Sequence, residues 1–310
     1  MARYETASHA TKGARKYQED ACAFARIGVP ASVTVPAALG GSPGTRDRDG
    51  IARATPDNAP EYITGNAVIA TGEGGAELVA VLADGMGGHA GGALASQTAC
   101  QSFITGYAHI YAGPDPGDRL ALALEMANRG VADEVTANPS LNGMGCTLIG
   151  AIFDAHGLRW VSVGDSHLFL FRRGELFMLN ENHSLAPVLD ELVATGQMTP
   201  EDALHHPRRH YLRSAVTGDE IELVDLPAET TALLPGDCVV LASDGIDTLE
   251  PDEIAELIET NLAAGAVAVT GSLIGAIAHA AVAHQDNTTI MAVVVLADEP
   301  LAKTERLVGG

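Results

Sequence analysis

Short apolar runs that stop abruptly at Gly, Asp or Arg mark the strands that the sequence predicts. Runs of four to nine residues rich in Val, Leu, Ile and Phe, bounded by turn-forming residues, are typical of buried strands. The predicted strands cover residues 78–83, 158–163, 168–171, 176–179, 238–242 and 288–296, with a turn at 172–175. They cluster in the middle and near the end of the chain.

Longer segments with helical periodicity lie between these runs. They predict helices over residues 93–110, 120–137, 252–262 and 271–284. The third follows Pro251 and opens with acidic residues, which suit a helix N-terminus. Residues 262–283 carry no Asp, Glu, Lys or Arg but consist mostly of Ala, Gly, Ser and Thr, so we interpret them as a buried packed helix rather than a membrane span.

The order of the elements favours an α+β fold. Strands and helices come in blocks and do not alternate regularly, which indicates layered antiparallel sheets covered by helices. Residues 27–66 are rich in Gly, Pro and Asp and predict a long loop or insertion. The 310 residues, 46% of them hydrophobic, are enough to bury a large core.

Charge narrows the classes of partner. The formal net charge of −22 argues against a nucleic-acid or anionic-membrane partner, because phosphate backbones select basic surfaces. A phosphorylated substrate stays compatible with this charge, since bound metal ions can reverse the local field within one cleft.

Cysteine usage and the first residues bear on location. The four cysteines are widely spaced and form no C-x-x-C pair, so we expect buried reduced thiols rather than disulfides or a zinc site. Residues 1–20 lack the apolar core of a signal peptide, and the expected location is cytoplasmic.

Four aspartates stand beside small or polar residues at the edges of predicted strands. They are Asp84, Asp165, Asp244 and Asp286. A single Asp-Gly is most simply a turn, but four such carboxylates without a matching set of Cys or His favour a site for a hard cation such as Mg²⁺ or Mn²⁺.

Two further segments are candidates for the same site. In DGMGGHAGG, residues 84–92, the backbone can bend so that a carbonyl faces the ion bound by Asp84, although a flexible turn explains the glycines equally well. In RKYQED, residues 15–20, Arg15 is a natural clamp for a phosphoryl group, and Glu19 and Asp20 can hold metal-bound waters. A solvated charged face is the alternative.

In combination, these segments resemble the metal-dependent protein phosphatases of type 2C, the bacterial members most of all. The resemblance runs from about residue 11 to residue 296. It rests on R-x-x-x-E-D at 15–20, DGMGGH at 84–89, MGCT at 144–147, VGDSHLFLFRRGEL at 163–176, NENHS at 180–184, SDG at 243–245 and DNTT at 286–289. One such match is weak, but seven in the same order are specific.

The resemblance implies a fold and a domain plan. The fold is a central β-sandwich of two antiparallel sheets flanked by helices on both outer faces, in four αββα layers. Residues 1–300 form a single catalytic domain, residues 185–218 a flap beside the cleft, and residues 301–310 a tail. The flap contains HHPRRH at 205–210, which suits either a substrate phosphate or a solvated face.

The resemblance also assigns roles to residues. Asp84 bridges two Mn²⁺ or Mg²⁺ ions, and Arg15 grips the substrate phosphate. The metal-site residues that it implies are Asp84, Gly85, Asp244, Asp286, Asp165, Glu19 and Asp20, with Asp165 and Asp244 as a pair for a third ion. Two departures stand out: Met86 replaces the His of eukaryotic relatives, which leaves His89 or water as proton donor, and Thr248 replaces an Asp common in relatives, with Asp247 one residue earlier.

The implied function is hydrolysis of phosphoserine and phosphothreonine on proteins by a metal-activated water, as part of bacterial signal transduction. The implied partners are phosphorylated substrates of a Ser/Thr kinase, and the implied state is a monomer. Two alternatives stay open: a pseudo-phosphatase that acts by binding, and a phosphatase of small metabolites.

Overall fold

A computed structural model describes residues 2–28, 61–63, 67–71, 76–86, 90–109 and 115–297. The predicted insertion at 27–66 lies largely outside the described residues, although Glu61–Ile63 forms a short strand. The predicted tail at 301–310 and the candidate proton donor His89 also lie outside them.

Two antiparallel sheets make the centre of the molecule. The six-stranded sheet has the order β11 (Glu175–Met178), β10 (His167–Arg172), β12 (Cys238–Ala242), β13 (Thr288–Leu296), β1 (Ala2–Thr11) and β4 (Ala67–Thr71). The five-stranded sheet has the order β3 (Glu61–Ile63), β2 (Ala21–Gly28), β5 (Ala76–Ala83), β8 (Leu148–Phe153) and β9 (Leu158–Val163). Strands β6 (Gly85–Met86) and β7 (Gly145–Cys146) form a separate short pair.

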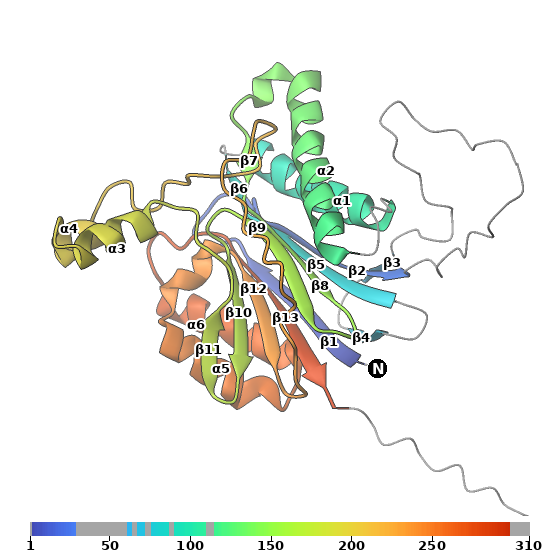
Figure 1. Cartoon of the computed structure of the whole chain (residues 1–310). Coiled ribbons are helices and arrows are strands. Elements are labelled where there is room, and N and C mark those ends of the chain that lie inside the picture. The colour runs from blue at the N-terminus through green and yellow to red at the C-terminus, as the bar shows by residue number, and fades with distance from the viewer. Residues whose placement is uncertain are drawn as a thin grey trace, which may run out of the picture.

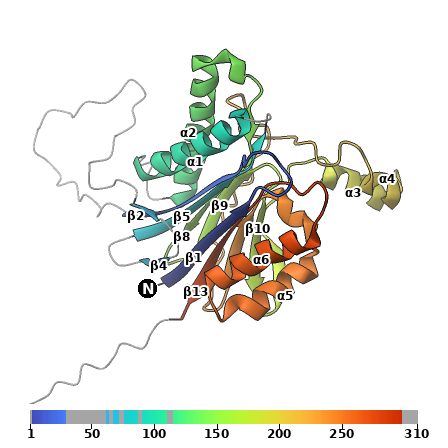
Figure 2. The ribbon, with the colours of Figure 1, turned by 180° about the vertical axis from the view of Figure 1, so that it is seen from behind.

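Helices cover both outer faces of the sandwich (Figures 1 and 2). Helices α1 (Ala90–His109) and α2 (Pro116–Ala137) pack against the five-stranded sheet, whereas α5 (Pro251–Leu262) and α6 (Ala266–Ala280) pack against the six-stranded sheet. The predicted four-layer αββα sandwich is therefore confirmed.

Strand β5 shows why a central strand is apolar on both faces. All eight of its residues are buried. Leu78, Ala80 and Leu82 face the other sheet, while Val79 and Val81 face the helices. Because side chains alternate along a strand, a strand between two layers needs apolar residues facing both of them.

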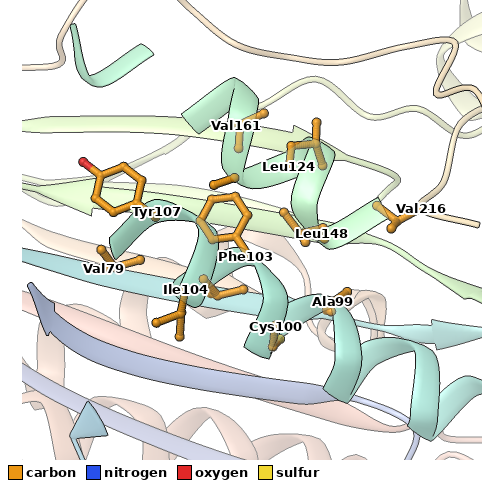
Figure 3. Packing of buried hydrophobic residues seen from close by; sticks show 14 of the residues in the cluster. Val79, Ala99, Cys100, Phe103, Ile104, Tyr107, Leu124, Leu148, Val161 and Val216 are labelled. Carbon is orange, nitrogen blue, oxygen red and sulfur yellow. The ribbon is translucent and has the colours of Figure 1, made fainter. Parts of the chain in front are cut away.

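Helix α1 lies unusually close to its sheet at one point. Figure 3 shows Phe103 of α1 lying over the sheet, near Leu148 and Val161. A Cβ atom on Gly150 of β8 would lie 2.1 Å from Cζ of this ring, so only glycine fits beneath it. The small residues of this sheet let large side chains of the helix reach it, which suits a core poor in aromatics.

Apolar periodicity identified six strands and four helices but missed others. Strand β1 carries Arg, Glu, Ser and His among few buried residues, and Gly150 interrupts the apolar run of β8. Helix α6 begins at Ala266, five residues earlier than predicted, and buries one face only, whereas a fully buried helix was expected. Among the described helices, none is long and apolar enough to cross a membrane.

The region between β11 and β12 holds two further helices, α3 (Ala186–Ala194) and α4 (Pro200–Leu204). They project from the sandwich in both views (Figures 1 and 2). This region contains the segment predicted as a flap. The described residues also include two 3₁₀ turns, η3 (Pro139–Leu141) and η4 (Asp244–Thr248).

Candidate metal centre

The ends of the central strands deliver carboxylates to one cleft. Asp84 directly follows β5, Asp165 lies between β9 and β10, Asp244 follows β12 at the start of η4, and Asp286 precedes β13. All four line a cleft of about 660 Å³, together with Glu19, Gly85 and Arg15. The structure therefore brings together seven of the predicted site residues, and Asp20 lies beside them.

The carboxylates of the cluster repel one another in a buried setting. Burial raises the pKa of Asp84 well above its ordinary value, and the charges of Asp20, Asp244 and Asp165 raise it further. Burial, followed by the charges of Asp165 and Asp286, raises the pKa of Asp244 to about 7. Burial also raises the pKa values of Asp20 and Asp165. Such an arrangement is costly unless a cation compensates it.

Two buried carboxylate oxygens of the cluster have no hydrogen-bond partner among the described residues. They are Oδ1 of Asp20 and Oδ1 of Asp244. The other oxygen of Asp20 accepts a hydrogen bond of 2.8 Å from Ser243. Unpartnered buried oxygens are rare in folded proteins, and an all-oxygen set fits a hard divalent cation.

The described side chains do not form a complete shell for one ion. No group of three or more His, Cys, Asp or Glu residues in the described part of the chain is arranged to enclose a single metal. Mg²⁺ is usually held by only one or two carboxylates and keeps several waters. The donor set therefore fits hydrated divalent ions shared between carboxylates better than a dedicated protein cage.

Gly85 places its backbone where a side chain would not fit. A Cβ atom on Gly85 would lie 2.3 Å from the carbonyl oxygen of Gly92 and 2.4 Å from that of Glu19. Gly85 also pairs with Cys146 in the short β6–β7 ladder. Close packing therefore explains this glycine at least as well as chain flexibility does.

Arg15 is the cation that directly contacts the cluster. Its guanidinium group forms an ion pair with Asp286, and 59% of its side chain is exposed. A guanidinium at the open side of a carboxylate cluster can also bind the oxygens of a phosphoryl group.

The walls of the cleft come from two loops. Lys16 and Tyr17 follow Arg15 on the loop after β1, and His210, Tyr211 and Leu212 belong to the predicted flap segment. Met86, in the position that eukaryotic relatives fill with His, lines the cleft too. The HHPRRH segment thus contributes His210 to the cleft.

Asp247 and Thr248, the two residues that depart from the family pattern, have partners of their own. Asp247 lies with Oδ1 2.8 Å from Nε2 of His167, and Thr248 donates a hydrogen bond of 2.5 Å to Gln285. Asp165 lines the cleft, but the side chains of Asp247 and Thr248 have their contacts with these other residues.

Several supporting residues had no predicted role. Thr147 accepts a hydrogen bond of 3.0 Å from the backbone N–H of Asp84, and Ser243 holds Asp20. Asn287 contacts the loop that carries Arg15. All three residues lie in sequence segments that match the family. Their supporting roles depend on contacts between segments that are distant in the sequence, so the sequence pattern alone does not reveal them.

Comparison with known proteins identifies the family of this chain. The profile of the protein phosphatase 2C family matches residues 67–270. The chain belongs to the protein phosphatase 2C family. Serine/threonine protein phosphatase PstP of Mycobacterium tuberculosis is 38% identical over 189 residues, 60% of this chain. The match spans only 35% of PstP, about a third of that protein.

Other phosphatase 2C relatives are matched more completely. Serine/threonine phosphatase stp of Listeria welshimeri is 30% identical over 189 residues, 59% of this chain and 72% of the relative. Among solved structures, the serine/threonine phosphatase of S. agalactiae superposes with a TM-score of 0.66 at 23% identity, over 94% of this chain and 99% of that one. The PstP catalytic domain in complex with two manganese ions gives 0.63 at 24% identity, over 96% and 100%. These structures support the phosphatase 2C fold.

Proposed function

We propose that this phosphatase 2C family member is a metal-dependent serine/threonine protein phosphatase. The observation that carries the proposal is the cluster of buried and partly buried aspartates, two with unpartnered oxygens, at one cleft beside Arg15. A fold that kept these carboxylates only for packing would carry their repulsion without benefit.

The metal ligands that we propose are those implied by the family resemblance, and they line the cleft. Asp84, the Gly85 carbonyl, Asp244 and Asp286 would hold two Mn²⁺ or Mg²⁺ ions. Glu19 and Asp20 would contact ion-bound waters, and Asp165 would serve a third ion. When bound, divalent cations lower the pKa of coordinated water and polarise phosphoryl oxygens. The two manganese ions of the PstP neighbour support this choice of metal.

The protein's own side chains would bind the phosphoryl group and hold the metal-site carboxylates in place. Arg15 would bind two phosphoryl oxygens and offset charge as the P–O bond breaks. Thr147 and Ser243 keep Asp84 and Asp20 in place. His89 stays the candidate proton donor to the leaving oxygen. Burial raises the pKa of Cys146, so its thiol stays protonated near neutral pH and is a poor nucleophile.

The cleft walls favour a protein over a metabolite as substrate. Tyr17 and Tyr211 line the cleft with 46% and 61% of their surface exposed. Exposed aromatic side chains at a cleft suit contact with a polypeptide, whereas small-molecule sites bury most of the ligand. We accordingly propose residues 185–218 as a substrate-facing flap.

The remaining assignments follow the family. We propose one catalytic domain over residues 1–300, a monomer, substrates phosphorylated by a Ser/Thr kinase, and a cytoplasmic location. The four cysteines are all free, which is consistent with a reducing compartment.

Hydrolysis assays test the proposal. We expect phosphoserine and phosphothreonine peptides to be hydrolysed with Mn²⁺ or Mg²⁺, faster than phosphorylated metabolites, and all activity to stop with a chelator. Full turnover in chelator would contradict the metal assignment, and turnover of metabolites alone would contradict the protein substrate. No turnover of any phosphate ester would favour a binding role.

A further inference from the structure

The loop that joins β1 to β2 carries three predicted site residues without regular structure of its own. Residues 12–20 contain neither helix nor strand, yet they bear Arg15, Glu19 and Asp20. Because more than half of the Arg15 side chain is exposed, packing does not fix its position. The backbone of the loop must therefore determine where the guanidinium group can reach.

Asn287 binds this loop with every polar atom of its side chain. Its Nδ2 donates to the carbonyls of Lys12 and Tyr17, each at 2.9 Å, and its Oδ1 accepts from the Glu19 N–H at 2.7 Å. The partners fix the amide orientation, because carbonyls only accept and the N–H only donates. The three bonds bracket Arg15 on both sides.

The same residue is also joined to Asp286. The Asn287 backbone N–H donates to Oδ1 of Asp286 at 2.7 Å, while the other carboxylate oxygen contacts Arg15. The backbone of the loop packs directly against the backbone of this segment: a Cβ atom on Gly13 would lie 2.4 Å from the carbonyl oxygen of Asp286. Asn287 itself is only 4% exposed.

We propose that Asn287 is a positioning residue that sets Arg15 and Glu19 against Asp286. The inference rests on the proposed phosphatase function. Only an amide of this length supplies two donors and one acceptor at once: an aspartate would lose both donors, and an alanine all three contacts. Loss of the Asn287 side chain removes the hydrogen-bond partners of three backbone groups of the loop, so the loop must shift or open to water.

A double-mutant cycle tests whether Asn287 acts through Arg15. The probe is inorganic phosphate, titrated calorimetrically into Mg²⁺-loaded wild type, Asn287→Ala, Arg15→Ala and the double variant. We expect Asn287→Ala to weaken phosphate binding about tenfold, as for a lost hydrogen bond to a charged group. In the Arg15→Ala background the same change should cost less than about twofold. Equal weakening in both backgrounds, or none in the first, would overturn the proposal.

Asn180→Ala is the matched control. Asn180 is 7% exposed and also binds backbone with both ends of its amide, to Leu168 at 2.7 Å and Ser166 at 2.9 Å. A general loss of stability would act alike in both variants. We expect any effect of Asn180→Ala on phosphate binding to be the same with and without Arg15. Coupling to Arg15 as strong as that of Asn287 would overturn the specific role.

Hydrogen exchange separates this inference from the proposed function. Asn287→Ala should speed amide exchange across residues 12–20, above all at Glu19, whereas Asn180→Ala should not. Unchanged exchange would overturn the positioning role. If the two variants differ in exchange as expected but the wild-type protein does not hydrolyse phosphopeptides, the proposed function is wrong and the positioning role of Asn287 still holds.

Discussion

The two ends of strand β5 carry a buried and a partly buried acidic residue in opposite situations. Glu77, the second residue of the strand, is 5% exposed and has its own partners: Arg119 at 2.8 and 3.0 Å and the Tyr107 hydroxyl at 3.0 Å. Asp84, directly after the strand, is surrounded by further carboxylates. One strand thus ends in a neutralised acid on one side and an uncompensated cluster on the other.

The difference shows what a structural acid requires. The Arg119 guanidinium not only pairs with Glu77 but also lies 3.9 Å from the centre of the Tyr107 ring, so the charge is offset and the cation is packed. The Asp84 end has Arg15, largely exposed, against several aspartates. Among the described residues, no cation is packed against Asp84 as Arg119 is packed against Glu77, which points to a ligand that brings positive charge.

The largest effect should come from neutralising the cluster. We expect Asp84→Asn to lower kcat on a phosphopeptide with Mn²⁺ by at least about 10³-fold, because metal ions supply several kcal/mol of charge stabilisation. In chelator the same variant should be more stable than wild type, since one repelling charge is gone. Steady-state kinetics and urea unfolding check both. Lower stability together with full activity would show that Asp84 has a structural role like that of Glu77 and would contradict its assignment to a metal site.

At the other end of β5, removal of a partner should cost stability instead. Arg119→Ala leaves Glu77 buried and unpaired, and we expect the free energy of unfolding to fall by about 3–5 kcal/mol, with activity per folded molecule retained. Replacing both Glu77 and Arg119 by Met should recover most of the loss, as for other buried ion pairs exchanged for apolar groups. A loss of activity without a loss of stability would contradict the structural role.

The β5 run illustrates what the sequence could predict. The apolar run at 78–83 predicted a buried strand, and the Asp that follows it predicted a site at the end of that strand. Glu77 was not distinguished, because its partners Tyr107 and Arg119 are 30 and 42 residues away and come together only through packing of α1 and α2. Asn287 went unassigned for the same reason: its contacts span about 270 residues.

The acidic cluster should make the stability of the protein depend on pH. Since the pKa of Asp244 is raised to about 7, the folded protein binds this proton more tightly than the unfolded chain, whose Asp has a pKa near 4. Stability in chelator should therefore fall as pH rises from about 4 to about 7, on the order of a few kcal/mol. Thermal melting across this range measures it. The fall should shrink in Asp244→Asn and persist in Arg119→Ala; a flat profile for wild type would contradict the repulsion.

The smallest effect should come from an exposed ion pair. Asp190 pairs with Arg209 at 2.8 Å in the flap segment, and 58% of its side chain is exposed. Asp190→Ala should change the free energy of unfolding by less than about 1 kcal/mol, because water screens such pairs. A loss as large as that of Arg119→Ala would show that burial is not what separates these acids.

Calorimetric titration of Mn²⁺ into chelator-stripped protein near neutral pH tests the central claim most directly. We predict two bound ions for wild type and for Glu77→Gln, and binding weakened at least about 100-fold in Asp84→Asn, about 3 kcal/mol of binding free energy. No Mn²⁺ binding by wild type, or unaltered binding by Asp84→Asn, would contradict the account.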